Sequence, residues 1–506
     1  MMTEEHSISE GERLWLPENQ HTPDGKKELS QKEREKHKNL LTHMFLSGQI
    51  TDRFFVEKND KKQFEPPKLS TSIRKIFPIV TLEDNDEIYI YNEEKGIYEP
   101  NGEKKLREIV KQVLRNEYRE PRAKAVIDDI TASTYLERED FAIPDYLVPV
   151  ENGFLDLRYN PPKLLPHSPN NYITSVMPVK YDPKAKCPNF LIFLEEILPD
   201  LPDRLKIQEG FGNCLTPSHD YMIIFFLYGQ GANGKSTLLN VLTIFLGNEN
   251  ISNASLGQLA YGKWYMAELY RKNANIYGDI GIKALKHTGS IKILTGEDWA
   301  QAEKKFKSPF KFKNYAKPWF SGNMMPDIYD DTDAFHRRWI IIIFHQQFLK
   351  GAPRTDPQMI QKLSSPEELS GILNWALEGY YRLRKQKTFS CLKPIDERRK
   401  QWHELSDSLS VFITNCTKPG NHIPKEDFFL SYHEYCIKKG LPLFSKSLVG
   451  RKMKEMGYKD VYPGSSGEQK WSWAGIEVTW EHVVTHNQDG QEGFERQANE
   501  DQWRDI

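Results

Sequence analysis

The chain has 506 residues and a formal net charge of −2 at pH 7, with 38% hydrophobic and 28% charged residues. This length predicts two to four domains, and the near-neutral balance excludes a globally basic protein, so any contact with nucleic acid must come from local patches. The five cysteines form no CxxC pair, which argues against a zinc ribbon or a disulfide framework and favours a reducing compartment. The N-terminus is polar and acidic and the longest apolar runs are strand-sized, so we expect neither a signal peptide nor a membrane span.

The first two hundred residues divide into two parts. Residues 1–70 are polar, with a charge-dense run at 26–38, and predict a flexible arm that is either solvated or used for interaction. Residues 71–200 predict a small α+β domain. Within it, residues 87–100 alternate around a turn like a β-hairpin, and helical patterns follow.

Residues 222–228 form an apolar run that ends in a glycine-rich turn, and the turn opens into a segment with apolar residues at helical spacing. This order is typical of a strand, a phosphate loop and a helix. Gly229, Gly234, Lys235 and Ser236 fit G-x-x-x-x-G-K-[ST], in which backbone N–H groups cradle phosphates, the lysine reaches the β/γ-phosphates and the hydroxyl binds Mg²⁺. The residues expected to contact the nucleotide are Gly229, Gly231, Asn233, Gly234, Lys235, Ser236 and Thr237.

Strand-like runs at 274–277, 318–320 and 339–344 alternate with helical segments beyond the phosphate loop. This alternation predicts a three-layer α/β nucleotide-binding core over residues 201–355. A helical lid or linker is expected at 356–405.

Polar residues after these strands are candidates for the chemistry. Asp279 follows the first run, where an acidic group is needed to hold Mg²⁺ and polarise the attacking water, although helix capping is an alternative role. Because no second acid stands beside it, the catalytic base stays open, with Glu297 and Asp298 as candidates. Asn323 follows the second run and is expected to orient the attacking water or sense the γ-phosphate.

Arg337 and Arg338 precede the last apolar run. An arginine at an exposed corner of such a core can act on a neighbouring subunit's nucleotide by supplying charge to the transition state. Either arginine can instead pair with Asp330, Asp331 or Asp333. We favour Arg338 slightly as the finger.

Residues 303–317, EKKFKSPFKFKNYAK, are the most basic stretch of the core and interleave lysines with aromatic residues. The alternation predicts a hairpin that offers ammonium groups to phosphates and rings to bases. The alternative is an amphipathic strand with its aromatics in the core and its lysines in water. The expected DNA contacts are Lys304, Lys305, Lys307, Lys311 and Lys313.

Residues 406–480 are expected to form a separate module. Two helical patterns followed by a strand pair favour a winged helix that binds DNA through Arg451 and Lys452, the alternative being a helical packing domain with a solvated basic face. Residues 481–506 form an acidic tail that predicts disorder.

Together these residues resemble the superfamily 3 helicase domain of the phage and plasmid primase-helicase family, which is related to the poxvirus primase-helicase. GQGANGKSTLLNVL resembles the family's phosphate loop, FSGNMMP its sensor asparagine and DDTDAFHRRWIIIIF its arginine motif. IKILTGEDWAQAEKKFKSPFKF resembles the segment that forms its DNA hairpin, and VENGFLDLRYNPPKLLPHSPNNYITSVMPVKYDPKAKCPNFLIFLEEI the small domain before the motor.

The resemblance implies an α/β fold: an AAA+-like three-layer P-loop ATPase core with a small N-terminal α+β domain and a C-terminal winged helix. It also implies ATP and Mg²⁺ as cofactors, with Lys235, Asp279, Asn323, Arg337 and Arg338 as catalytic residues and Ser236 and Asp279 at the metal. Residues 1–74 are too short for the primase that many relatives carry, so a separate primase or other replication proteins are expected as partners.

The function expected from this resemblance is that of an ATP-dependent DNA helicase of viral, plasmid or mobile-element replication, in the cytoplasm of a host cell. Its partners would be single-stranded and forked DNA and, in a homohexameric ring, further copies of the chain, with no membrane. The alternative is an ATP-dependent initiator that binds an origin and melts DNA locally without processive unwinding. A packaging motor fits less well, because a nuclease-like carboxylate cluster after the motor is missing from the sequence.

Overall fold

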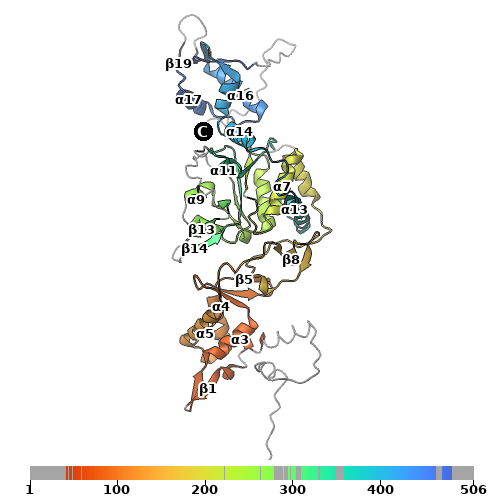
Figure 1. Ribbon diagram of the computed structural model, residues 1–506, viewed down its shortest axis with the longest axis vertical. Coiled ribbons are helices and arrows are strands. Elements are labelled where there is room, and N and C mark those ends of the chain that lie inside the picture. The colour runs from red at the N-terminus through yellow and green to blue at the C-terminus, as the bar shows by residue number, and fades with distance from the viewer. Residues whose placement is uncertain are drawn as a thin grey trace, which may run out of the picture.

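The structure is a computed structural model that describes residues 42–43, 45–47, 50–58, 60–221, 223–261, 264–278, 289, 294–296, 298–303, 309–326, 328, 331–348, 358–462 and 470–480. The molecule is elongated: an N-terminal unit lies at one end, a parallel sheet between helices in the middle, and a C-terminal module at the other end (Figure 1). Across the described ranges, no helix combines the length and apolar character needed to cross a membrane.

The described part of the N-terminal unit contains a four-stranded sheet, a separate two-stranded hairpin and α-helices. Its elements are η1 (Thr51–Phe54), β1 (Phe55–Lys58), β2 (Lys61–Phe64), α3 (Pro66–Ile76), β3 (Ile79–Leu82), β4 (Ile88–Asn92), β5 (Ile97–Glu99), α4 (Gly102–Leu114), η2 (Arg115–Glu117), α5 (Glu120–Ser133) and β6 (Tyr135–Leu136). The sheet order is β5-β4-β3-β6, and β4–β5 is the hairpin expected over residues 87–100.

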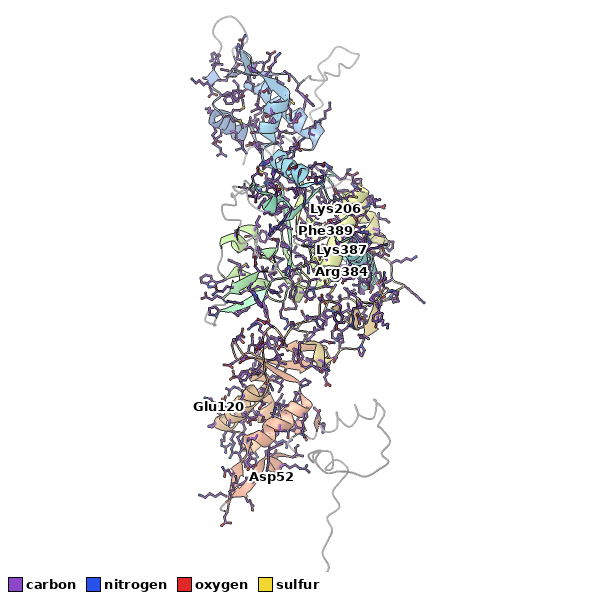
Figure 2. All side chains as sticks on the ribbon, in the orientation of Figure 1. Asp52, Glu120, Lys206, Arg384, Lys387 and Phe389 are labelled. Atoms are coloured by element: carbon purple, nitrogen blue, oxygen red, sulfur yellow. The ribbon has the colours of Figure 1, made fainter. Side chains whose placement is uncertain are left out.

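The unit extends further toward the N-terminus than the polar composition predicts. Phe54 and Phe55 are buried in one cluster with apolar residues of α3, α4 and α5. The flexible arm expected over residues 1–70 is therefore wrong for residues 51–70, because these aromatic side chains give the charged segment an apolar surface to pack on. Asp52 and Glu120 lie in this unit, far from the central sheet (Figure 2).

A β-meander and two helices connect this unit to the central sheet. They are β7 (Leu147–Val150), β8 (Gly153–Asp156), β9 (Lys163–Leu165), η3 (Pro169–Asn171), α6 (Pro188–Ile197) and α7 (Leu201–Asn213). Asn152 and Gly153 stand at the turn between β7 and β8, which pair antiparallel.

The central unit is built on a five-stranded parallel sheet of order β11-β12-β15-β10-β16. Its elements are β10 (Ile224–Tyr228), α8 (Lys235–Leu246), η4 (Asn248–Asn250), β11 (Ile251–Ser252), α9 (Leu256–Tyr261), η5 (Tyr265–Leu269), β12 (Ala274–Tyr277), β13 (Trp299–Ala302), β14 (Phe310–Lys313), β15 (Lys317–Gly322), α11 (Asp333–His336), β16 (Trp339–Ile343), α12 (Met359–Leu363), α13 (Pro366–Gln386) and α14 (Ile395–Ser406). The strand that precedes the phosphate loop, β10, lies between β15 and β16, so both of its edges are paired.

Both faces of the parallel sheet are covered, as its uninterrupted apolar strands require. Phe225 and Leu227 of β10 face a cluster that includes α6, α7, α8 and α13. Ile224, Phe226 and Tyr228 face the opposite cluster, which includes α9 and residues of α14. The alternation along one strand therefore separates two helical layers, as expected for an α/β protein.

Helix α13 belongs to the covering layer rather than to a lid. It packs along α7 so closely that a Cβ on Gly212 would lie 2.5 Å from the backbone nitrogen of Tyr380. The fully buried carboxylate of Glu209 accepts hydrogen bonds from Arg382 Nε (2.7 Å) and the Ser390 N–H (2.7 Å). The expectation of a lid or linker over 356–405 is therefore wrong for α13, and α14 alone leads to the C-terminal module. Lys206 and Arg384 lie on this helical side of the sheet (Figure 2).

The described part of the C-terminal module has three helices, a three-stranded antiparallel sheet of order β18-β20-β19 and a two-stranded sheet of β17 and β21. Its elements are α15 (Ser408–Cys416), β17 (Thr417–Lys418), β18 (His422–Pro424), α16 (Lys425–Lys439), α17 (Lys446–Glu455), β19 (Asp460–Val461), β20 (Ser472–Ala474) and β21 (Glu477–Val478). Phe412, Phe428 and Tyr432 form its apolar centre. The acidic tail expected over residues 481–506 lies outside the described residues.

Candidate nucleotide-binding site

The turn between β10 and α8 depends on glycine at two positions. Gly234, directly before α8, has a φ of +85°, and a Cβ there would lie 2.5 Å from Cγ2 of Ile197. A Cβ on Gly229 would collide with the Asn233 side chain and lie 2.7 Å from the carbonyl oxygen of Phe344. Because only glycine combines a positive φ with such close contacts, the backbone can curl around the start of α8.

Lys235 lies inside this turn with its side chain buried. Its Nζ donates hydrogen bonds to the carbonyl oxygen of Gly229 (2.6 Å) and to Oδ1 of Asn233 (2.8 Å), and it lies 3.5 Å from Oδ1 of Asn323. The ammonium group thus lies at the N-terminal end of α8, whose partial positive charge favours the binding of anions.

Asn323 reaches the loop because β15 runs parallel to β10. Tyr228 is in register with Gly322, and the Gly229 N–H donates to the carbonyl oxygen of Gly322 (3.3 Å). Carboxyl ends of adjacent parallel strands meet at one edge of a sheet, which is where ligands of open α/β sheets bind. The sequence predicted both residues as site residues, and the fold brings them together.

A cavity of about 370 Å³ opens at this edge, a volume in the range of ligand pockets. Its walls come from the loop, the first turn of α8 and the end of β15. The lining residues are Gly231, Ala232, Asn233, Gly234, Lys235, Ser236, Thr237, Ser321, Gly322 and Asn323.

Contacts from the segment after β16 also hold the loop, a feature that the sequence did not signal. Buried Asn233 donates from Nδ2 to the carbonyl oxygen of Phe344 (3.4 Å), and the Phe348 N–H donates to the carbonyl oxygen of Ala232 (2.6 Å). Asn233 therefore stabilises the conformation of the loop, and its Oδ1 accepts a hydrogen bond from Nζ of Lys235.

Asp279 and Glu297 lie outside the described residues, so their predicted roles stay predictions. The residue before Asp279 is described: a Cβ on Gly278 would lie 3.5 Å from Oγ of Ser321, which lines the cavity. Asp298 is exposed at the start of β13 and does not line the cavity. The position of Asp298 outside the cavity therefore does not support it as the catalytic base.

The two neighbouring arginines have opposite environments. Arg338 is buried, and its guanidinium donates from Nε to Oγ1 of Thr295 (2.9 Å) and from Nη1 to the carbonyl oxygen of Ala334. Arg337 is exposed at the C-terminal end of α11. A buried guanidinium bonded within its own subunit is poorly placed to reach another subunit, so the slight preference for Arg338 as the finger is not supported.

Two of the acidic residues expected to pair with these arginines, Asp331 and Asp333, have other partners, and Asp333 pairs with Arg399. Asp331 Oδ1 lies 2.6 Å from His336 Nε2 and 3.0 Å from His403 Nε2 in α14, and Arg399 Nε lies 3.7 Å away. Burial lowers the pKa of His336 and opposes the effect of Asp331, so its imidazole is held neutral. Asp330 lies outside the described residues.

Asp331, His336 and His403 could together hold a metal ion, because one ligand atom of each lies within 4.8 Å of the others. The guanidinium of Arg399 opposes a second positive charge there, and the carboxylate is already satisfied by hydrogen bonds. We therefore interpret the cluster as a polar clamp that joins α11 to α14.

The β13–β14 hairpin has a buried face and an exposed face. Phe310 and Phe312 are buried and pack against Tyr270, whereas Lys311 and Lys313 are exposed. The expectation that Phe310 and Phe312 offer their rings to bases is therefore wrong, because these rings complete the apolar layer. Lys304, Lys305 and Lys307 lie outside the described residues.

The exposed ring of the hairpin is one that the lysine-rich run did not include. Trp299, four residues before that run, is 47% exposed and stands opposite Lys313 in the β13–β14 register. Alternation of large and small side chains from residue 299 onward is the sequence signal that marks this exposed ring.

In the C-terminal module, the two predicted DNA contacts also differ. Lys452 lies 3.3 Å from Asp407 and packs over the ring of Phe444, so it stabilises the module. Arg451 is exposed on α17, with Glu455 4.0 Å away. Of the two predicted contacts, Arg451 is therefore the one whose charge is exposed to solvent.

The parallel sheet and its glycine-rich turn define an α/β protein with a P-loop-like core. The family model described as D5 N terminal like matches residues 49–199, and that of a family of unknown function, DUF5906, matches residues 227–338. The chain is 27% identical over 365 residues to "Putative helicase L207/L206" of Acanthamoeba polyphaga mimivirus, with 65% of this chain and 37% of the relative aligned. The chain thus spans well under half the length of that relative.

The solved structures that match the chain include those of the NrS-1 C-terminal region. An A-form apo structure of residues 305–718 has a TM-score of 0.42 and 13% identity, covering 80% of this chain and 98% of that chain. A second A-form apo structure has a TM-score of 0.42 and 14% identity, covering 80% and 97%. The resemblance predicted from the motifs is confirmed at this level: the chain is similar to a family described as D5 N terminal like and to a viral protein named as a putative helicase.

Proposed function

We propose that this protein is an ATP-dependent DNA helicase that acts in the replication of a virus, plasmid or mobile element. The observation that carries the proposal is the meeting of Lys235 and Asn323 at one cavity, at the carboxyl ends of β10 and β15. The similarity to a mimivirus protein named as a helicase supports the class of reaction.

The residues of the cavity fit a nucleoside triphosphate with Mg²⁺. The glycine turn leaves room for phosphates close to the backbone, and Lys235 Nζ would exchange the oxygen atoms of Gly229 and Asn233 for phosphate oxygens. Mg²⁺ would neutralise charge on the β- and γ-phosphates and would be held by Ser236 and Asp279. Asn323 would orient the attacking water, being the polar side chain that stands opposite Lys235.

Arg337 is the arginine that we assign to a neighbouring subunit's nucleotide in a homohexameric ring. Its exposure supports this assignment, and the buried position of Arg338 supports a role in holding the segment in place. Lys311 and Lys313 on the hairpin and Arg451 on the C-terminal module would contact the phosphates of single-stranded and forked DNA. The winged-helix interpretation of that module belongs to this proposal, as does the AAA+-like superfamily 3 assignment.

The test is ATP hydrolysis with and without single-stranded DNA, together with unwinding of a forked duplex, in the wild type, Lys235→Ala and Lys385→Ala. Lys385 is an exposed lysine of α13 and serves as the control. We expect DNA-stimulated hydrolysis and unwinding in the wild type and the control, and neither in Lys235→Ala. Hydrolysis that ignores DNA, without unwinding, would refute the helicase and favour the initiator that melts DNA locally.

A further inference from the structure

A second cavity, of about 390 Å³, lies between the N-terminal unit and the hairpin. Three parts of the chain that are distant in sequence line it: the segment after β6, the turn after η5, and the outer face of β13–β14. Arg138 and Phe141 come from the first part, Arg271 from the second, and Trp299 and Lys313 from the third.

Arg138 fixes one wall of this cavity. Its guanidinium donates to both carboxylate oxygens of Asp84, from Nε (2.6 Å) and Nη2 (2.8 Å). The same group lies 4.5 Å from the ring centre of Phe310 in the hairpin and 5.0 Å from that of Tyr270. A residue of the N-terminal unit thus stacks on the base of the hairpin, and this bidentate pair gives the wall a fixed geometry.

Arg271 contributes a cation to the second wall of the cavity. Its backbone has a φ of +59°, an unusual conformation for an arginine. The guanidinium lies 4.4 Å from the ring centre of Phe141, and Nη2 donates to the carbonyl oxygen of Tyr172 (2.5 Å). Nη1 is shielded from solvent, and the same guanidinium interacts with the side chain of Tyr315, another residue of the cavity wall. Arg271 therefore contributes positive charge to this wall.

The hairpin supplies a ring and two ammonium groups on one face. In the β13–β14 register, Trp299 stands opposite Lys313 and Gln301 opposite Lys311, with all four side chains exposed. Lys313 Nζ lies 5.5 Å from the ring centre of Trp299. Neither lysine forms an ion pair with a carboxylate of the described ranges, so both charges are available to phosphates.

We propose that this cavity binds one base of single-stranded DNA, stacked on Trp299, with the flanking phosphates on Lys311, Lys313 and Arg271. The inference rests on the proposed function for the identity of the nucleic acid. An exposed ring beside cations is the combination that holds single strands without sequence preference. The volume is near the lower end for ligand pockets, which suits one unstacked base rather than a duplex. The N-terminal unit thereby becomes part of the strand-binding surface.

The test is the affinity of the wild type, without ATP, for a fluorescently labelled oligothymidine and for an abasic strand of the same length. Trp299→Ala is expected to weaken binding of oligothymidine about tenfold, the effect of one lost base stack. The same substitution should leave binding of the abasic strand unchanged, because that strand has no base to stack. Trp299→Phe should restore most of the affinity.

Tyr159→Ala is the matched control. Tyr159 is 44% exposed and has Lys163 Nζ 3.5 Å from its ring centre, but it does not line the cavity. Its substitution should leave both affinities unchanged. Lys313→Ala should reduce the slope of log affinity against log salt by about one, whereas Trp299→Ala should leave that slope unchanged.

Equal affinities for Trp299→Ala and the wild type on oligothymidine would overturn the inference, as would an equal loss on the abasic strand. Full competition by thymidine monophosphate would also overturn it in favour of a free-nucleotide site. If the wild type hydrolyses ATP and binds single-stranded DNA, and the Trp299→Ala variant binds that DNA equally well, only this inference fails. A wild type that binds no single-stranded DNA would defeat the proposed function as well.

Discussion

Separate substitution of Arg337 and Arg338 by alanine should affect different properties: Arg338→Ala should lower stability, and Arg337→Ala should lower ATP turnover. Arg338→Ala removes charged hydrogen bonds to Thr295 and to the carbonyl oxygen of Ala334 in a buried site. A hydrogen bond from a charged group contributes about 1.5–3 kcal/mol, so we expect a loss of roughly 3 kcal/mol. For a unit of this size, that lowers Tm by roughly 6–12 °C.

Arg337→Ala should leave the free energy of unfolding within about 0.5 kcal/mol of the wild type, because the side chain is exposed. Turnover should fall by roughly 10³–10⁵ if this guanidinium completes a neighbour's site, while binding of an ATP analogue persists. Arg337→Lys should recover little, since an ammonium group lacks the planar fork.

The assays are differential scanning calorimetry, steady-state ATP hydrolysis and titration with a fluorescent, non-hydrolysable ATP analogue. Wild-type turnover in Arg337→Ala would refute the assignment. An Arg338→Ala protein that melts like the wild type, binds the analogue and does not hydrolyse ATP would return the role to Arg338.

Three further substitutions test individual side chains. Lys452→Ala should lower the stability of the C-terminal module by roughly 1 kcal/mol without changing the salt dependence of DNA binding. Arg451→Ala should lower the slope of log DNA affinity against log salt by about one and leave Tm unchanged. The reverse pattern would contradict the assignment. Burial lowers the pKa of His219 from 6.5 to about 3, so the folded state favours the neutral imidazole. Its contribution to the free energy of unfolding is therefore complete above about pH 6.5. As the pH falls toward 3, that contribution is lost by up to about 1.4 kcal/mol per pH unit. Urea unfolding of His219→Gln should show a correspondingly weaker loss of stability on acidification, and an unchanged pH profile would speak against this account.

The sequence predicted the phosphate loop well, because its signal is local. An apolar run, a glycine turn and a helical repeat determine β10 and α8 with little help from the rest of the chain. Asn323 was also predictable, since a polar residue at the end of a parallel strand reaches the same edge of the sheet.

The environments of individual side chains were less predictable, because they depend on packing between distant segments. Arg337 and Arg338 have the same charge and adjoining positions, and only the turn from α11 into β16 decides which one is buried. Phe310 and Phe312 looked like a surface for bases, but Tyr270, about forty residues earlier, gives them an apolar partner. Asn233 illustrates the same limit, since its acceptor at Phe344 lies beyond any local pattern.

Helix α14 is attached to the arginine motif at several points before it enters the C-terminal module. Arg398 donates to the carbonyl oxygens of Arg337 (2.9 Å) and Trp339 (3.5 Å), and Trp402 packs 4.9 Å from Trp339, ring centre to ring centre. Figure 1 shows this helix between the central sheet and the module.

Helix α14 is therefore a rigid connection whose contacts with the arginine motif lie beside Arg337. A force that turns the C-terminal module about the sheet must either strain these bonds or move the backbone that carries Arg337. In the ring that we propose, a load on the C-terminal module of one subunit would therefore be transmitted along α14 to the backbone that positions Arg337.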